Sequence, residues 1–319
     1  MLRERVKAEK MATRDAYGKA LVKLGRENED VVVLDADLSS STRTYMFGNE
    51  FPERFFNVGI AEQNMIGMAA GLATCGKVPF VSTFAVFASG RAYNQVRQCI
   101  AYPNLNVKIV ATHGGISVGE DGPSHHCTED VAVMRALPNM TVIVPADAVE
   151  TGKAVRAIAE HVGPVYMRLG RPKVPVIYDE GLNFKIGEAV PLRDGDDVTI
   201  IAAGIMVAKA LEAASRLADD GIGARVIDMH TIKPIDHEVI VKAARETGAM
   251  VTAEEHSIIG GLGSAVAEVL VEEHPVPMLR VGVKDEFAES APAEELLAKY
   301  GLTTSSILNA AREVIRKKR

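Results

Sequence analysis

The chain of 319 residues is longer than one hydrophobic core usually spans, and its 47% hydrophobic and 24% charged residues are typical of a globular protein. A net charge of −6 gives no basic surface for nucleic acid or an anionic membrane, and no stretch approaches the length of a membrane-spanning segment. We therefore expect two folded domains without a nucleic-acid or membrane partner.

Two further features predict a cytoplasmic location. The N-terminal segment MLRERVKAEKMATRD is charged throughout and lacks the apolar core of a signal peptide. The three cysteines, Cys75, Cys99 and Cys127, are an odd number without CxxC spacing. They therefore predict neither a disulfide framework nor a zinc site, and reduced thiols suit the cytoplasm.

The first half of the chain alternates between helical and strand patterns. A helix is predicted from Thr13, because Tyr17, Ala20, Leu21 and Leu24 recur at helical spacing. The next elements expected in chain order are strand 31–36, helix 62–75, strand 79–84, helix 88–101, strand 106–113, strand 141–145, helix 147–161 and strand 164–169. Such alternation predicts a doubly wound, mostly parallel sheet.

A second alternating set follows a stretch without clear periodicity between residues 170 and 197. Its expected elements are strand 198–204, helix 206–219, strand 224–230, helix 236–246, strand 249–255, helix 261–273, strand 277–282 and helix 303–317. We therefore predict an α/β protein of two domains, 1–175 and 196–319, joined by a linker at 176–195. Each domain is expected to be a mostly parallel sheet flanked by helices.

Glu62 opens the apolar helix predicted at 62–75. A carboxylate in the first turn is stabilised by the helix dipole, by about 0.3–1 kcal/mol, which would give Glu62 a purely structural role. The alternative is a buried acid that hydrogen-bonds a heterocycle. The position alone does not choose between the two.

The loop 111–130 is rich in glycine and carries His113, Glu120, Asp121, His125 and His126. Glycines let a loop fold tightly and approach a ligand, and the polar side chains supply proton donors and acceptors. The consecutive side chains at positions 125–127 point in different directions, which disfavours zinc. A capped turn with exposed histidines is the remaining structural alternative.

Five segments of the chain, in this order and with these separations, resemble the transketolase family. Three of them, GIAEQNM, STFAVF and ATHGGISVGEDGPSHH, are similar to its pyrimidine-binding domain. The other two, ARVIDMHTIKPID and EEHSIIGGLGSA, are similar to its C-terminal domain. The resemblance covers nearly the whole chain from about residue 12.

The resemblance implies an enzyme of sugar-phosphate metabolism that uses thiamine diphosphate. The reaction would transfer a two-carbon ketol unit from a ketose phosphate to an aldose phosphate, as in the pentose phosphate pathway. Glu62 matches the glutamate that hydrogen-bonds N1′ of the aminopyrimidine and favours its imino form. Phe84 and Phe87 match aromatic residues that pack on this ring, and Asp37 matches an aspartate beside the cofactor.

The resemblance also implies a set of substrate contacts. His113 and His125 match histidines that contact the donor's hydroxyl groups near the reacting carbon, where they stabilise oxyanions and move protons. Asp121 matches the residue that reads a neighbouring sugar hydroxyl.

A phosphate site is implied as well. Arg171 matches an arginine that holds the substrate phosphate through its planar fork of donors. Arg14 and Ser41 are expected to complete this site, with an ordinary surface position as the structural alternative for both. For Asp37 a helix cap is an equally good alternative without the resemblance.

One departure from the family concerns the other half of the cofactor. The family holds the diphosphate through Mg²⁺ with a Gly-Asp-Gly motif, and no Gly-Asp-Gly occurs in this sequence. We therefore expect no metal ligand in this chain, a separate N-terminal subunit that carries the diphosphate and Mg²⁺ site, and activity only with that partner. Self-association to a dimer would give a heterotetramer of two chains of each kind.

Two smaller departures affect substrate preference. Gly90 stands where an aromatic residue is common, and His126 stands where glutamine is common. The enzymatic alternatives are the β subunit of a 2-oxoacid dehydrogenase or a relative of deoxyxylulose-phosphate synthase. A non-catalytic, regulatory relative is the alternative from another class, because a fold does not secure a function.

Overall fold

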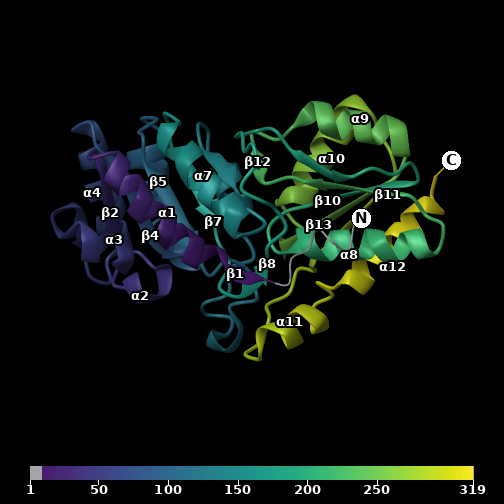
Figure 1. The fold of residues 1–319 in the computed structure, drawn as a ribbon, viewed down its shortest axis with the longest axis horizontal. Coiled ribbons are helices and arrows are strands. Elements are labelled where there is room, and N and C mark those ends of the chain that lie inside the picture. Colours follow the sequence, from purple (N-terminus) through teal and green to yellow (C-terminus); the bar gives the residue numbers. More distant parts are fainter. Residues whose placement is uncertain (1–8, 319) are drawn as a thin grey trace.

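The structure is a computed structural model that describes residues 9–318. The beginning of the first predicted domain, residues 1–8, lies outside this range, as does Arg319 of the basic C-terminus. Its strands form a seven-stranded sheet, a five-stranded sheet and a two-stranded pair. The predicted α/β class, with two mostly parallel sheets flanked by helices, is confirmed (Figure 1).

The seven-stranded sheet contains the β-branched runs that the sequence predicted as buried strands. Its strands, in sheet order, are β12 (Thr231–Lys233), β6 (Thr141–Ile143), β7 (Val165–Arg168), β5 (Lys108–Thr112), β4 (Val78–Phe84), β2 (Val31–Asp35) and β3 (Phe55–Asn57). All pairs are parallel except β12 with β6. β2 and β5 are buried along their whole length, as strands covered on both faces must be.

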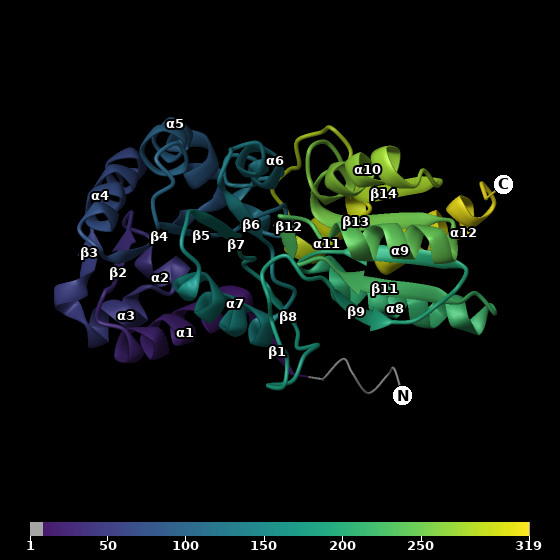
Figure 2. The same cartoon turned by 90° about the horizontal axis from the view of Figure 1, so that it is seen from above.

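Helices cover both faces of this sheet. They are α1 (Thr13–Glu27), α2 (Ser39–Thr42), α3 (Tyr45–Glu50), α4 (Glu62–Thr74), α6 (Asp130–Arg135) and α7 (Ala148–Glu160), with short 3₁₀ turns η1 (Pro52–Arg54) and η4 (Gly119–Asp121). Figure 2 shows α4 and α6 above the sheet and α1, α3 and α7 below it. The loops after the strands therefore meet at one edge of a covered sheet, where sites of this architecture form.

The segment 87–101 differs from the regular helix predicted at 88–101. It contains two π-helical stretches, η2 (Phe87–Arg91) and η3 (Val96–Ala101), around the short helix α5 (Tyr93–Gln95). A π-turn accommodates an extra residue in a helix and occurs most often at functional sites. Apolar spacing alone did not reveal that extra residue.

The five-stranded sheet forms the second lobe. Its strands, in sheet order, are β14 (Met278–Val283), β13 (Met250–Ser257), β10 (Val198–Ala202), β11 (Ala224–Asp228) and β9 (Val190–Arg193). In this sheet, as described for residues 9–318, β9 is the one strand that pairs antiparallel with its neighbour. Its helices are α8 (Met206–Asp219), α9 (His237–Thr247), α10 (Leu262–Glu273), α11 (Ala293–Lys299) and α12 (Thr304–Ile315). Figure 1 shows α9 and α10 on one face and α8 and α12 on the other.

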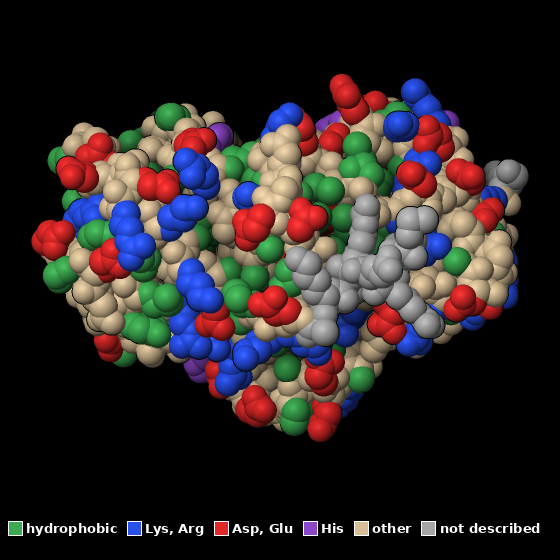
Figure 3. Space-filling model, in the orientation of Figure 1, with side chains coloured by type: hydrophobic (Ala, Val, Ile, Leu, Met, Phe, Trp, Pro, Cys, Tyr) green, Lys and Arg blue, Asp and Glu red, His purple; other side chains and the backbone are tan. Residues whose placement is uncertain are grey.

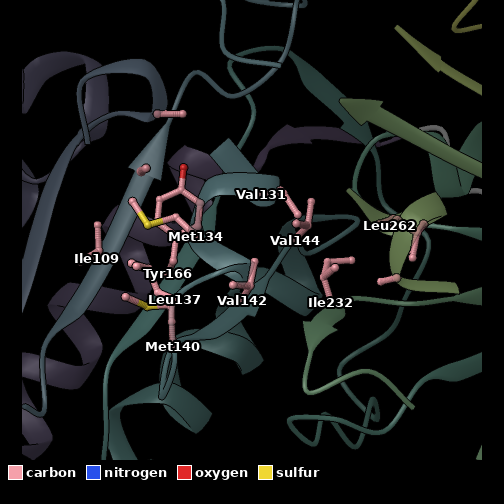
Figure 4. Close-up of a cluster of buried hydrophobic side chains, with 14 of the residues drawn as sticks. Ile109, Val131, Met134, Leu137, Met140, Val142, Val144, Tyr166, Ile232 and Leu262 are labelled. Carbon is pink, nitrogen blue, oxygen red and sulfur yellow. The ribbon is translucent and has the colours of Figure 1, made fainter. Parts of the chain in front are cut away.

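The two lobes share secondary structure and an apolar core. β12 comes from the C-terminal half but pairs with β6 of the seven-stranded sheet, and β1 (Lys10–Ala12) pairs with β8 (Lys173–Pro175). Figure 4 shows Ile232 of β12 and Leu262 of α10 beside Val142 and Val144 of the first lobe. The predicted domain limits at 175 and 195 stay a prediction.

A buried ionic network also joins the lobes. Nε of Arg168 on β7 lies 3.0 Å from Oδ2 of Asp130, which accepts a hydrogen bond from the Tyr166 hydroxyl at 2.7 Å. Arg168 donates to the backbone oxygen of Glu255 on β13 at 2.7 Å, and the Glu255 carboxylate accepts from the amide of Ser117 at 2.6 Å. Burial alone would lower the pKa of Arg168, but Asp130 and Glu255 raise it above its ordinary value.

Two glycines of the loop 111–130 leave space for this network. A Cβ at Gly114 would lie 2.2 Å from Nε of Arg168, and one at Gly115, whose φ is +84°, would lie 2.1 Å from Glu255 Oε1. The sequence led us to expect a close approach to a ligand here. At these two positions the neighbours are instead side chains of the protein itself.

A second buried polar cluster links α7 to β11. One carboxylate oxygen of Asp147 caps α7 by accepting from the amide of Glu150 at 2.8 Å, and the other accepts from the amides of Ile177 and Tyr178. The Tyr178 hydroxyl donates to Asp228 at 2.7 Å. Asp228 also contacts Glu150, and two carboxyl groups can share a hydrogen bond only if one of them is protonated.

This cluster makes the stability of the fold depend on pH. Burial, the largest cause, raises the pKa of Asp228 to about 7 and holds the pKa of Glu150 well above its ordinary value. Since carboxyl groups in an unfolded chain titrate near pH 4, the folded state binds the proton more tightly. Its stabilising contribution is complete below about pH 4 and is lost as the pH rises through about 7.

We expect Glu150→Gln to be more stable than the unchanged chain above pH 7, by on the order of 1–3 kcal/mol. The amide stays neutral and keeps an oxygen for the hydrogen bond from the amide of Ala146. Urea unfolding at pH 5 and pH 8.5 measures the difference. Glu160→Gln on the exposed end of α7 is the control, and equal destabilisation of Glu150→Gln at both pH values would contradict the shared proton.

None of the helices within residues 9–318 is long and apolar enough to span a lipid bilayer.

Candidate active site

The candidate site residues come from loops that follow the strands of the seven-stranded sheet. Asp37 follows β2, Phe87 follows β4, His113 follows β5 and Arg171 follows β7. Because these strands are parallel, their carboxyl ends lie at the same edge of the sheet. Residues spread over more than 130 positions of sequence are thereby brought to one edge.

Glu62 is buried at the first position of α4, with 5% of its surface exposed. Its carboxylate oxygen Oε1 lies 3.2 Å from a guanidinium nitrogen of Arg91, a side chain that is 54% exposed. The same guanidinium lies over the ring of Phe87, with Cζ 4.1 Å from the ring centroid. Glu62 and Phe87 therefore face one another across the Arg91 side chain.

An aromatic stack continues from Phe87 into the loop 111–130. The rings of Phe84 and Phe87 are stacked with centroids 5.7 Å apart, and Phe84 stacks on the imidazole of His113 at 3.8 Å. The His125 ring is T-shaped to Phe84 and Phe87, with ring centroids 6.2 and 5.6 Å apart. The structure thus brings together four of the predicted residues.

His113 is fixed in one tautomer by its two neighbours. Arg14 can only donate, so its contact of 3.4 Å with Nε2 requires that nitrogen to accept. Nδ1 then carries the proton and donates to the Thr112 hydroxyl at 2.8 Å. Burial and the charges of Arg14 and Arg171 lower the pKa of His113 to about 3, so the ring is neutral at pH 7.

The turn 119–126 presents the remaining polar residues of this loop. Nδ1 of His125 lies 2.9 Å from the Ser124 hydroxyl, and the His125 ring is half-buried. Nε2 of His126 donates to the backbone oxygen of Gly119 at 3.0 Å, which turns this buried ring into the protein. His126 therefore supports the turn, whereas His125 reaches the aromatic stack.

Arginine side chains lie beside His113. Arg14 donates to the backbone oxygen of Ser41 at 3.0 Å. Arg171 donates to the backbone oxygen of Val118 and lies 3.9 Å from a carboxylate oxygen of Asp121. Figure 3 shows Lys and Arg side chains gathered on this face between the positions of α2 and α11. This arrangement can bind an anionic group next to the histidine.

Asp37 lies apart from these contacts. It is exposed, has a φ of +65°, and accepts a hydrogen bond from the amide nitrogen of Asn57 at 2.9 Å. Its neighbour Asp35 is buried and accepts from the hydroxyls of Thr42 and Thr44 at 2.7 and 2.8 Å, which holds the turn that carries Ser41.

Sequence reasoning missed two arginines of the site. Arg43 has a left-handed φ of +72°, lies against α1, and its charge lowers the pKa of Arg14 after burial, the larger cause. Arg91 contacts Glu62 and Phe87. The positive φ of Arg43 could not be predicted from the sequence, because arginine rarely adopts it. Arg91, by contrast, directly follows Gly90, a position already noted as unusual.

The residues present fit the pyrimidine end of thiamine diphosphate. Glu62 supplies a buried carboxylate that contacts the half-exposed guanidinium of Arg91, and Phe87 supplies a ring face on the other side of that guanidinium. Among residues 9–318, no three His, Cys, Asp or Glu side chains are grouped to hold a metal ion.

Two family models match the chain. The model described as "Transketolase, pyrimidine binding domain" matches residues 9–176. The model described as "Transketolase, C-terminal domain" matches residues 187–307. The first contains every candidate site residue named above.

Some similar proteins are matched over nearly their whole length, and others over only half of it. A Methanocaldococcus jannaschii protein, whose name assigns it provisionally to the transketolase C-terminal section, is 54% identical over 95% of this chain and 96% of its own. A Clostridium 6-deoxy-6-sulfo-D-fructose transketolase subunit is 47% identical over 98% of this chain and 97% of its own. Human transketolase is 41% identical over 97% of this chain but only 50% of its own.

Solved structures show the same division. One described as a split gene transketolase in an inactive β4 tetramer has 57% sequence identity and a TM-score of 0.90, and the match covers 98% of this chain and 100% of that chain. Leishmania mexicana transketolase has 27% identity and a TM-score of 0.82, covering 98% of this chain and 47% of its own. Both lobes are therefore arranged as in these proteins.

Proposed function

The chain belongs to the transketolase family, and we propose that it is the cofactor-activating subunit of a two-subunit transketolase. It would transfer a two-carbon ketol unit between sugar phosphates, with thiamine diphosphate as cofactor. The observation that carries this proposal is the buried Glu62 carboxylate facing the ring of Phe87 at the edge of the parallel sheet.

Thiamine diphosphate, when bound, supplies the carbon nucleophile and the electron sink for C–C bond cleavage. Glu62 would hydrogen-bond the pyrimidine and exchange a proton with it, which a buried carboxyl with one movable partner can do. Phe84 and Phe87 would pack on the pyrimidine and exclude water. Asp37 is a weaker member of the cofactor site, because its contact is with Asn57.

The substrate would lie over His113 and His125. His113 is neutral at pH 7 with its proton on Nδ1, so Nε2 would accept a proton from a substrate hydroxyl once Arg14 turns to a substrate anion. The protonated Nε2 could then donate to an oxyanion. Asp121 would read a sugar hydroxyl at the mouth of the site, where it is exposed. Arg171, Arg14 and Ser41 would hold the terminal phosphate.

A partner subunit would supply the diphosphate and Mg²⁺ site. The human enzyme has about twice the length of the region that matches this chain, and the relative from Clostridium is named as a subunit. The similar solved structure of four β copies is described as inactive. We therefore infer a heterotetramer in the cytoplasm, with self-association of this chain and the domain limits given above.

The decisive experiment combines the purified chain with thiamine diphosphate, Mg²⁺, xylulose 5-phosphate and ribose 5-phosphate. Glyceraldehyde 3-phosphate is measured with and without a co-expressed chain that carries a Gly-Asp-Gly motif. We expect product only from the mixture, because each chain would hold one end of the cofactor. Product from this chain alone would contradict the need for a partner.

The same mixture separates the alternatives. Turnover of a 2-oxoacid in place of the ketose phosphate would assign the chain to the oxoacid dehydrogenases. Condensation of pyruvate with glyceraldehyde 3-phosphate would assign it to the deoxyxylulose-phosphate synthases. The positive charges of Arg14, Arg43 and Arg171 act on His113 and favour an anionic substrate such as a sugar phosphate.

A further inference from the structure

Arg91 contacts two of the residues assigned to the cofactor, but the proposed mechanism gives it no role. Its guanidinium is bound on two sides, by Oε1 of Glu62 at 3.2 Å and by the ring of Phe87, whose centroid is 4.1 Å from Cζ. The two partners are the carboxylate and the aromatic face assigned to the pyrimidine ring of the cofactor. A planar cation thus lies between the two groups that would bind a planar heterocycle.

The guanidinium and a bound pyrimidine would need the same space. A ring that hydrogen-bonds Glu62 must place an atom about 2.7–3.2 Å from its carboxylate, and stacking on Phe87 requires a separation of a few ångströms from that face. The guanidinium already meets both conditions. We propose that Arg91 occupies the pyrimidine position in the free subunit and competes with thiamine diphosphate, an inference that rests on the proposed function.

The surroundings of Arg91 allow it to leave. Its side chain is 54% exposed, and its backbone oxygen is held separately by the side-chain amide of Gln63 at 3.0 Å. The preceding residue, Gly90, has no side chain, and a Cβ there would meet nothing within 4 Å. The guanidinium can therefore swing outward over Gly90 without displacing the π-helical stretch that carries it.

The contact has a chemical consequence for Glu62. While the guanidinium of Arg91 occupies Oε1 of Glu62 at 3.2 Å, that oxygen is not free to hydrogen-bond a pyrimidine nitrogen. Arg91 therefore satisfies a buried carboxylate while the site lacks its cofactor, and withdraws when the heterocycle takes over the hydrogen bond. The site of the free subunit is thus closed to the pyrimidine until the cofactor binds.

The test is the affinity of the assembled two-subunit enzyme for thiamine diphosphate. Cofactor-free enzyme is titrated by calorimetry at a fixed Mg²⁺ concentration, with the unchanged chain and with Arg91→Met, which keeps the apolar stem but removes the planar cation. We expect Kd to fall roughly fivefold, the effect of one half-exposed ion pair together with a cation–π contact. Arg91→Lys, which keeps the charge but not the planar fork, should give an intermediate Kd.

Arg97→Met is the matched control, because Arg97 is an exposed arginine on the same irregular helix, and its Kd should equal that of the unchanged enzyme. An unchanged or weaker affinity of Arg91→Met would overturn the inference while leaving the proposed function intact. Failure of the unchanged assembly to bind the cofactor would overturn both. The readout is binding, so it does not depend on turnover.

Discussion

Glu62→Gln is expected to lower turnover of the assembled enzyme by at least about a thousandfold, the size of a lost general acid–base group that starts each cycle. Glutamine keeps the shape of the side chain and can still hydrogen-bond a ring nitrogen, but it cannot exchange a proton. The effect should therefore fall on kcat, while Kd for thiamine diphosphate changes by less than about tenfold. Steady-state kinetics and calorimetry on the same preparation separate the two.

The fold should tolerate this change. Glu62 loses only its ion pair with a half-exposed arginine, which is worth little in water. Glu50→Gln is the matched control, because Glu50 also pairs with an arginine, Arg26, but lies on the surface. Retention of a tenth or more of the turnover by Glu62→Gln would contradict the role of Glu62 as the acid.

Arg168→Met is expected to be the most destabilising single change, by about 3–5 kcal/mol, because it leaves the charge of Asp130 buried without a cation. Asp130 has no exposed surface and would keep only the hydroxyl of Tyr166. The lost hydrogen bond from Arg168 to the backbone of Glu255 also weakens the contact between the lobes. Thermal unfolding followed by circular dichroism should show a lower Tm.

Two further variants test the reason for that loss. Arg156→Met removes an exposed arginine with two surface ion pairs and should change stability by less than about 1 kcal/mol. Arg168→Met combined with Asp130→Asn should recover part of the stability, since the buried charge is removed with its partner. If the double variant is less stable than Arg168→Met alone, the loss is one of packing and not of charge.

The alternation of strands and helices was predictable because strands covered on both faces must be apolar throughout. β2 and β5 are buried runs of this kind. β12 was not predictable, since three residues carry no periodicity and its partner β6 lies about ninety positions away. The short helices α2 and α3 were not predicted for the same reason. The π-helical form of 87–101 depends on an extra residue in the helix, which the spacing of apolar residues does not reveal.

The site residues that lie in a recognisable motif could be predicted from the sequence. Contacts that depend on the direction in which a side chain points could not. Phe84, Phe87, His113 and His125 form one stack. Their order in sequence says nothing about whether His126 or His125 turns toward that stack. The partner of Glu62 was equally invisible, because a flexible arginine 29 residues away can point in many directions.

The strand β12 limits how this chain can be recombined with others. Although it lies beyond residue 230, it completes the sheet of the first lobe by pairing with β6. If a chimera were cut between the lobes, its N-terminal piece would keep β6 but lose β12, so that β6 would become an unpaired edge strand. Unpaired edge strands tend to pair with other chains and cause aggregation. Exchange of lobes between relatives therefore has to carry the β12 segment with the N-terminal piece, or choose parents whose β6 and β12 are already matched to each other.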